Sequence, residues 1–145
     1  MDPKNLLKLD DHICFSLYAC SRAIFRMYRP LLDDLELTYP QYLVLLVLWD
    51  HQECSIKEIS EILTLDSGTL TPMLKRMESA KLIVRKRSET DERIVIIQIT
   101  DSGMALQERA ACIPEAMLAS SGMDKEEFNA LNQAIKKLMS HVENA

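Results

Sequence analysis

The sequence predicts a mainly α-helical domain that carries one small β-hairpin. Only three glycines occur among the 145 residues, and the five prolines fall near expected helix edges. Apolar residues recur at steps of three and four along most of the chain, which is the period of an amphipathic helix. Two runs of β-branched residues, 82–87 and 93–99, interrupt this pattern and indicate two strands joined by a short polar link.

The first helix is predicted from a long apolar stripe. Its members are Leu6, Leu9, Ile13, Leu17, Cys20, Ile24, Met27 and Leu31. We expect them to lie on one face of a single helix. Pro30 should end or bend this helix, because proline has no amide hydrogen and its ring clashes with the preceding turn.

Two capping boxes mark the next helix starts. Thr38 and Ser55 are each followed, three residues later, by a side chain that can return the hydrogen bond, Gln41 and Glu58 respectively. The run 42–49 is apolar on all sides, which predicts a helix buried on most faces.

A helix-turn-helix is predicted next. The short helix that starts at Ser55 is followed by a break and by a second helix over 67–81. The inner face of this second helix consists of Leu70, Met73, Leu74 and Met77. Because the predicted hairpin follows directly, residues 55–99 have the element order of a winged helix-turn-helix.

Two further helices are expected after the hairpin. Thr100 caps one that runs from 101 to about 118, and Asp124 with Glu127 caps the last one. The last helix carries Phe128, Leu131, Ile135, Leu138 and Val142. The outer segments 5–35 and 101–143 both present continuous apolar faces, which can either fold back on the winged unit or pair with a second copy of the chain. We expect the second arrangement, in which these segments are the dimerisation helices of an intertwined homodimer.

Composition limits the class of protein. With 48% hydrophobic and 27% charged residues, the chain can form one packed domain over 1–145 and is unlike a disordered chain. No uncharged apolar run reaches the roughly 18 residues of a membrane span. The amino terminus is unlike a secretory signal, so we expect a cytoplasmic protein without membrane contact.

Cysteine and histidine usage predicts no metal site and no cofactor. The four cysteines, Cys14, Cys20, Cys54 and Cys112, form no CxxC pair, and the three histidines are isolated from one another. In a cytoplasmic chain, scattered thiols are most often small buried side chains.

The charge is strongly polarised along the chain. Residues 75–87 hold six basic side chains and one acidic side chain, Glu78. This segment therefore has a net charge of +5, and the rest of the chain has −10, which together give the total of −5. The six form what we call the basic strip: Lys75, Arg76, Lys81, Arg85, Lys86 and Arg87. Such a strip predicts phosphate contacts, although the acidic total alone argues against nucleic acid.

The start of the helix 67–81 is suited to DNA. Ser67, Thr69 and Thr71 can donate to phosphates or touch base edges in the major groove. Pro72 makes this helix start late or kink. A kink would set how the first turn enters the groove, or would be a packing feature only.

The hairpin loop places Arg93 beside Asp91 and Glu92. Arginine at a ribbon tip can enter the minor groove with a carboxylate holding its guanidinium. An ordinary exposed salt bridge explains the same residues.

These segments resemble the MarR family of winged-helix repressors, and within it the organic-hydroperoxide-sensing branch. The resemblance is carried by LDSGTLTPMLKRM at 65–77 and RKRSETDER at 85–93. Further support comes from CFSLY at 14–18, YRPLL at 28–32 and LTYPQYL at 37–43. The similarity covers nearly the whole chain and fades toward the carboxyl end.

The resemblance implies a homodimer that binds a pseudo-palindromic operator in double-stranded DNA. It implies that Cys14 is the peroxide sensor, with Tyr28 and Tyr39 hydrogen-bonded to it across the dimer and Tyr18 nearby. The resemblance places Ser67, Thr69, Thr71, Lys75, Arg76, Asp91 and Arg93 at positions that approach DNA. From the helix start and the basic strip, we add Pro72, Arg85 and Arg87 to the predicted DNA-binding residues.

Thiol chemistry is compatible with that role. Only a thiolate attacks a peroxide, and an ordinary cysteine has a pKa of about 8.5. Asp10 and Asp11 lie one turn before Cys14 and would disfavour its thiolate, so the tyrosine hydroxyls should supply the activation. Apolar neighbours of Cys14 favour an organic hydroperoxide as oxidant.

The second cysteine of two-cysteine relatives is missing from 119–122. We therefore expect a sulfenic acid at Cys14 that a small cellular thiol caps as a mixed disulfide. Cys112 is an alternative resolving thiol. Cys20 lies six residues from Cys14, about 9 Å along one helix, too far for a local disulfide, and we expect Cys20 and Cys54 in the core.

The predicted function is a repressor that releases its operator when Cys14 is oxidised, and not an enzyme. One alternative keeps the fold and makes a small phenolic ligand the trigger. A second alternative is a thiol peroxidase. A third is a helical protein-interaction module, and such a module would lack salt-dependent DNA affinity.

Overall fold

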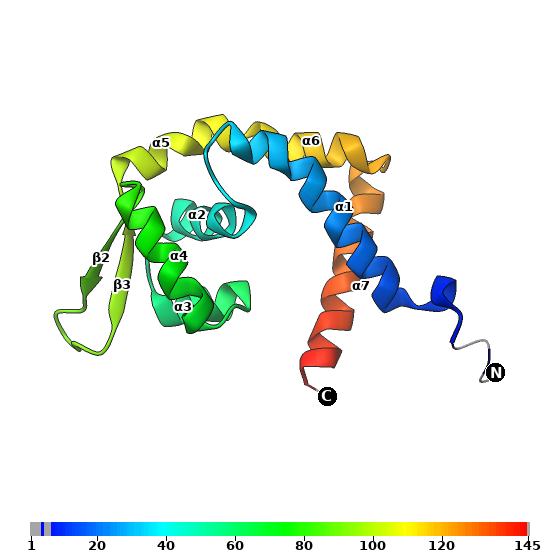
Figure 1. The fold of residues 1–145 in the computed structure, drawn as a ribbon, viewed down its shortest axis with the longest axis horizontal. Helices are drawn as coiled ribbons and strands as arrows, with labels where there is room; N and C mark the ends of the chain where they lie inside the picture. Colours follow the sequence, from blue (N-terminus) through cyan, green and yellow to red (C-terminus); the bar gives the residue numbers. More distant parts are fainter. Residues whose placement is uncertain (1–3, 5–6, 145) are drawn as a thin grey trace. The chain divides into compact units, whose positions relative to one another are not determined.

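The computed structural model describes residues 4 and 7–144 and confirms the mainly helical fold with a small antiparallel sheet (Figure 1). Two compact units are distinguished, Met1–Ala110 and Ala111–Ala145. The first contains the sheet and the helices α1 to α5, and the second contains α6 and α7. The expectation of a single domain over 1–145 stays a prediction.

The first helix is shorter than the apolar stripe predicts. A separate 3-10 helix spans Leu9–Asp11, and α1 spans Ile13–Asp33. His12 has an extended backbone, and its ring nitrogen donates to the Lys8 carbonyl at 2.7 Å, which breaks the stripe into two elements. Leu6 lies outside the described residues. Pro30 does not end α1, because one missing amide leaves the neighbouring helical hydrogen bonds in place.

Helix α2, Tyr39–His51, is confirmed as a largely buried helix. Its capping box forms as predicted, with both hydrogen bonds between Thr38 and Gln41. Five of its side chains are buried: Tyr42, Val44, Leu45, Val47 and Leu48. Leu46 is the exception, with 42% of its surface exposed.

The helix-turn-helix consists of α3, Ile56–Leu63, and α4, Ser67–Ser79. The capping box between Ser55 and Glu58 is confirmed, and the predicted inner face of α4 is buried. Of the two alternatives predicted from Pro72, a late start or a kink, the late start is wrong. Asp66 accepts the Thr69 amide at 2.6 Å and fixes the beginning of α4 at Ser67, and Pro72 is accommodated inside the helix.

The predicted hairpin is confirmed as β2, Ile83–Arg87, and β3, Val95–Ile99. A third strand, β1, Glu53–Ser55, was not expected and pairs antiparallel with β3, so the sheet order is β1-β3-β2. Strand β2 is therefore an edge strand.

The single helix expected over 101–118 is two helices, α5, Asp101–Ala110, and α6, Cys112–Ser121. Pro114 explains the interruption, because it cannot donate to the carbonyl of Ala110 and its ring crowds that carbonyl. Thr100 caps α5 by accepting the Gly103 amide, as predicted. The last helix, α7, Lys125–Glu143, begins at the predicted Asp124 cap.

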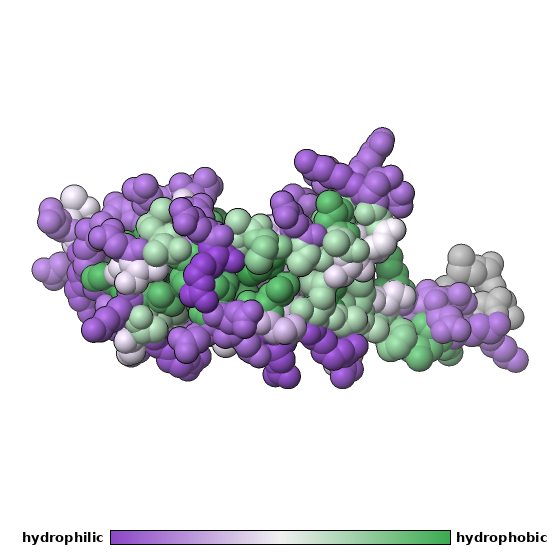
Figure 2. Space-filling model, turned by 90° about the horizontal axis from the view of Figure 1, so that it is seen from above, coloured by the Kyte–Doolittle hydropathy of each residue, from purple (hydrophilic) through white to green (hydrophobic). Residues whose placement is uncertain are grey.

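The buried core lies between α2, α3, α4 and the sheet. By contrast, α1 buries only Leu32, and α7 buries none of its described residues. Hydrophobic side chains consequently reach the surface between hydrophilic ones (Figure 2). Among the described residues, no helix is both long and apolar enough to cross a membrane.

Candidate nucleic-acid interface and redox site

The first turns of α4 present the predicted contact residues to the surface. Ser67, Thr69 and Pro72 are exposed, as are Lys75 and Arg76 further along the helix. Thr71 is half-buried, and its hydroxyl donates to the Ser67 carbonyl at 2.8 Å. The methyl group of Thr71 and the hydroxyls of the other two residues are thus the groups that α4 offers to a ligand.

A groove of about 360 Å³ lies between the starts of α3 and α4 and the strand β3. Its lining residues are Ser55, Ile56, Lys57, Ser67, Thr71, Arg93, Ile94 and Val95. Lys57 was not expected here from the sequence. Its position in the first turn after the Ser55 cap could have indicated it, since a first-turn side chain lies beside the free helix amides.

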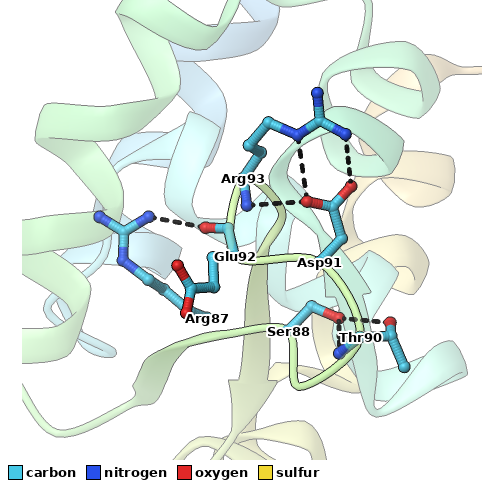
Figure 3. Close-up of polar contacts among 6 residues, drawn as sticks. All are labelled: Arg87, Ser88, Thr90, Asp91, Glu92 and Arg93. Carbon is cyan, nitrogen blue, oxygen red and sulfur yellow. Dashed lines mark hydrogen bonds and ion pairs between the residues drawn. The ribbon is translucent and has the colours of Figure 1, made fainter.

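The tip of the hairpin holds Arg93 in a fixed geometry (Figure 3). Both carboxylate oxygens of Asp91 accept from the guanidinium, at 3.1 and 3.2 Å, and one of them also accepts the Arg93 amide at 3.1 Å. The hydrogen bonds from Arg93 lower the pKa of the Asp91 carboxyl. The Arg93 side chain nevertheless stays 91% exposed, so the ion pair orients the cation without covering it.

A second arginine restrains the same loop (Figure 3). Arg87 donates to the carbonyl oxygen of Glu92 at 2.8 Å, and the hydroxyls of Ser88 and Thr90 are 3.0 Å apart. The hydrogen bond from Arg87 connects the end of β2 to the opposite side of the hairpin loop.

The basic strip is largely available to a polyanion. Five of its six side chains are exposed: Lys75, Arg76, Lys81, Lys86 and Arg87. Arg85 is different, because its guanidinium donates to Glu78 at 3.2 Å and its amide donates to the other oxygen of Glu78 at 2.9 Å. These hydrogen bonds lower the pKa of the Glu78 carboxyl.

Cys14 is an exposed side chain in the first turn of α1. Asp10 and Asp11 belong to the separate 3-10 helix, so the two carboxylates are not on the helix that carries Cys14. In the part of the chain that the structure describes, none of the four cysteines is in a disulfide.

The other cysteines occupy different environments. Cys54 is buried in β1, as predicted. Its burial raises the pKa of its thiol, and the negative charge of the nearby Glu58 raises that pKa further. The expected burial of Cys20 is wrong, because α1 packs mainly against α2 and leaves Cys20 exposed. Cys112 is exposed in the first turn of α6.

Two of the three predicted sensor-supporting tyrosines lie together. The rings of Tyr28 and Tyr39 are 5.1 Å apart, and Phe25 is 4.9 Å from Tyr39. Burial, with smaller contributions from Tyr39 and Tyr42, raises the pKa of Tyr28 to about 12, and burial also raises that of Tyr39. Both hydroxyls therefore keep their protons at neutral pH and can donate.

Tyr18 lies apart from this pair. It is 62% exposed on α1, with the guanidinium of Arg22 5.5 Å from its ring centre. Within the described ranges, no three His, Cys, Asp or Glu side chains are grouped as metal ligands.

Comparisons with known proteins agree with this geometry. A family model for the transcriptional regulator SarA/Rot matches residues 26–110. The chain is 51% identical over 133 residues to the organic hydroperoxide resistance transcriptional regulator of Bacillus subtilis, covering 92% of this chain and 90% of that protein. This chain belongs to the MarR family of winged-helix transcriptional regulators. Within the MarR family it falls in the organic-hydroperoxide branch, as the resemblance implied.

Solved structures of MarR-family members support the same assignment. Reduced AbfR bound to DNA, a Staphylococcus epidermidis protein, is 35% identical with a TM-score of 0.78, and the match covers 96% of this chain and 97% of that one. Overoxidized AbfR bound to DNA is 40% identical with a TM-score of 0.72, and the match covers 92% of this chain and 98% of that one. The winged helix-turn-helix predicted from the sequence is thereby confirmed as the fold.

Proposed function

We propose that this MarR-family chain is a DNA-binding repressor that senses organic hydroperoxides through Cys14 and then releases its operator. The observation that carries the proposal is the exposed Cys14 thiol at the start of α1, in a chain 51% identical to an organic hydroperoxide resistance regulator. The role is non-enzymatic, and we infer that it is exercised in the cytoplasm.

For DNA binding, we infer that α4 enters the major groove and the hairpin tip enters the adjacent minor groove. The exposed cations of α4 would neutralise phosphates, while its hydroxyl residues would contact phosphates or base edges. The exposed and oriented guanidinium of Arg93 supports the minor-groove contact. The proposed contacts are Ser67, Thr69, Thr71, Pro72, Lys75, Arg76, Arg87, Asp91 and Arg93.

We infer a homodimer from the uncovered apolar faces of the two outer segments. On α1, Ile13 and Phe25 are 61% and 46% exposed. On α7, Leu131, Leu138 and Val142 are 45%, 36% and 64% exposed. A second copy that covers segments 5–35 and 101–143 would bury these side chains and place two α4 helices on a pseudo-palindromic operator.

The proposed sensing step is a two-electron oxidation of Cys14. Its thiolate attacks the terminal oxygen of the hydroperoxide, the O–O bond breaks, and the leaving alkoxide takes a proton to become an alcohol. The resulting sulfenic acid is attacked by a small cellular thiol, which forms the S–S bond of a mixed disulfide and releases water.

Support for the sensing role of Cys14 comes from its exposure and from candidate hydrogen-bond donors. Cys14 is exposed in the first turn of α1. The protonated hydroxyls of Tyr28 and Tyr39 are donors that could reach Cys14 from the partner subunit, as the family resemblance implies. Cys54 is unsuited to sensing, because it is buried and its pKa is raised.

Release would follow from crowding at the dimer interface. A bulky mixed disulfide on Cys14 would break the tyrosine hydrogen bonds and change the spacing of the two α4 helices. Cys112 as a resolving thiol stays a prediction, and replacing it should leave release by hydroperoxide and thiol intact if Cys14 is capped by a small thiol.

The proposal is tested by operator binding of the wild type, Cys14→Ser and Cys20→Ser, each with and without an organic hydroperoxide. Cys20→Ser is a matched control, because Cys20 is a second exposed thiol on α1. We expect the oxidant to release the wild type and Cys20→Ser while Cys14→Ser stays bound. Equal release of all three proteins would show that Cys14 is not the sensor.

A further inference from the structure

Glu78 joins the helix α4 to the wing strand β2 through two hydrogen bonds to one residue. Its Oε2 accepts the backbone amide of Arg85 at 2.9 Å, and its Oε1 accepts the Arg85 Nε at 3.2 Å. The two side chains are 36% and 27% exposed, so the ion pair is partly shielded from water. Hydrogen bonds of this charge-assisted kind are stronger than neutral ones.

The contact to the amide has a specific structural reason. Arg85 lies opposite Ile97 in the ladder between β2 and β3, and β2 has no neighbour on its other side. An edge strand presents its outward amides to solvent. The Glu78 carboxylate satisfies one of these amides and thereby attaches the middle of β2 to the end of α4.

The near end of β2 is held separately. The turn out of α4 places Lys81 in the left-handed region at φ 65°, and Thr100 donates to the carbonyls of Lys81 and Leu82 at 2.7 and 3.0 Å. These contacts fix where the strand begins. The ladder to β3 aligns β2 within the sheet, and the contact to Arg85, further along the strand, connects the strand directly to α4.

We propose that Glu78 and Arg85 form a clamp that sets the direction of the wing relative to α4. In this role, Arg85 is a positioning residue whose charge is neutralised by Glu78, and not the phosphate contact that the basic strip predicts. The clamp would hold Arg93 at the distance from α4 that simultaneous contacts in two grooves require. The inference rests on the DNA-binding half of the proposed function and is independent of Cys14.

The sign of one substitution separates the clamp from simple electrostatics. Glu78→Ala removes a negative charge beside the basic strip, and charge alone would strengthen DNA binding. Loss of the clamp weakens binding instead, by about tenfold, which is the scale of one charge-assisted hydrogen bond. Glu89→Ala is the matched control, because it removes an exposed carboxylate from the same wing and should strengthen binding.

The salt dependence of binding tests the role of Arg85. Arg85→Met keeps the aliphatic stem and removes the charge. We expect it to weaken binding with an unchanged slope of log K against log salt, whereas Lys75→Ala should reduce that slope by about one unit, as for a lost phosphate contact.

The double variant Glu78→Ala/Arg85→Met completes the test, because its net charge equals that of the wild type. The clamp predicts an affinity as low as that of either single variant, while independent charges predict an affinity near that of the wild type. Thermal unfolding of each variant checks that all are folded.

The inference is overturned if Glu78→Ala strengthens binding as Glu89→Ala does, or if Arg85→Met lowers the salt slope by one unit. A wild type without salt-dependent affinity for operator DNA would contradict the proposed function itself, and the clamp with it. A wild type that binds, with a Glu78→Ala variant that binds equally well, contradicts the clamp alone.

Discussion

At the scale of single residues, the tyrosines inferred to support the sensor are chemically distinct from ordinary surface phenols. Tyr28 and Tyr39 pack against each other, and burial raises the pKa of both. A phenol with a raised pKa is a hydrogen-bond donor over the whole physiological range. The pair can therefore donate to a thiolate without competing ionisation.

This environment predicts a stability change at high pH. The pKa of Tyr28 is about 12 in the folded chain against 10.0 for the ordinary group, so the unfolded chain loses this proton first. The free energy of unfolding should fall as pH rises from about 10 toward 12. In the Tyr28→Phe variant, the free energy of unfolding should fall less steeply between these pH values. Below pH 9, the pH dependence of its free energy of unfolding should match that of the wild type. Urea unfolding at several pH values measures this, and equally steep curves for both proteins would contradict the burial of the phenol.

Some residue contacts were predictable and others were not. The capping boxes at Thr38 and Ser55 follow from residues three apart on one helix turn, so the sequence alone indicates them. The contact between Glu78 and Arg85 was missed, because it crosses a turn and depends on which β2 amides face outward. The neighbouring Asp91 and Arg93 were identified, but their degree of exposure required the structure.

At the scale of elements, α5 is attached to the DNA-binding lobe by a tight junction. Trp49 of α2 donates from its indole nitrogen to the Gly103 carbonyl at 2.9 Å. Gly103 also lies directly against the Leu82 carbonyl and the Ile99 side chain, which leaves no room for a Cβ atom. The close approach of α5 to the strands therefore depends on glycine at this position.

Gly103→Ala should destabilise the fold by about 1–3 kcal/mol, the usual range for overpacking. Gly68→Ala is the matched control, since its added Cβ would be 3.5 Å from the nearest Asp66 oxygen, an ordinary contact. The control should be neutral or more stable by up to about 1 kcal/mol, because alanine favours helix. Denaturant unfolding gives both values. A Gly103→Ala variant as stable as the control would contradict the junction.

Element boundaries show where sequence reasoning reached its limit. The period of apolar residues predicted α4 and α7 well, because α4 buries and α7 exposes one continuous face. Helix α2 was predicted instead from its capping box and its continuous apolar run. Strand β1 was missed, since three residues carry too little pattern for a strand. The separation of α5 from α6 was also missed, although Pro114 could have indicated it.

At the scale of the whole molecule, charge is distributed very unevenly along the chain. The basic strip of 75–87 lies on α4 and the wing, while the remainder of the chain is acidic. Large exposed apolar side chains are most numerous on α1 and α7, although Val84 of β2 and Ile94 of the wing are also exposed. The basic strip supports a surface for DNA, the apolar faces of α1 and α7 support contact with a second copy of the chain, and the acidic remainder limits DNA contact outside the strip.

The dimer inferred from the exposed apolar side chains of α7 can be tested by measuring the oligomeric state of the chain in solution. Leu138→Glu places a charge in the apolar stripe and should shift the chain from dimer to monomer, with loss of operator affinity. Gln133→Glu is the matched control, because the helical period puts residue 133 on the opposite side of α7. Sedimentation measures both variants. A wild type that is monomeric at micromolar concentration would contradict the inferred dimer.

The central claim is that oxidation of Cys14 releases the operator. Its most direct test titrates the preformed protein–DNA complex with an organic hydroperoxide and a small thiol, and measures DNA release together with the Cys14 mixed disulfide by mass spectrometry. We predict that the fraction of DNA released rises with the fraction of Cys14 in the mixed disulfide. Complete release while Cys14 is still a reduced thiol would contradict the account.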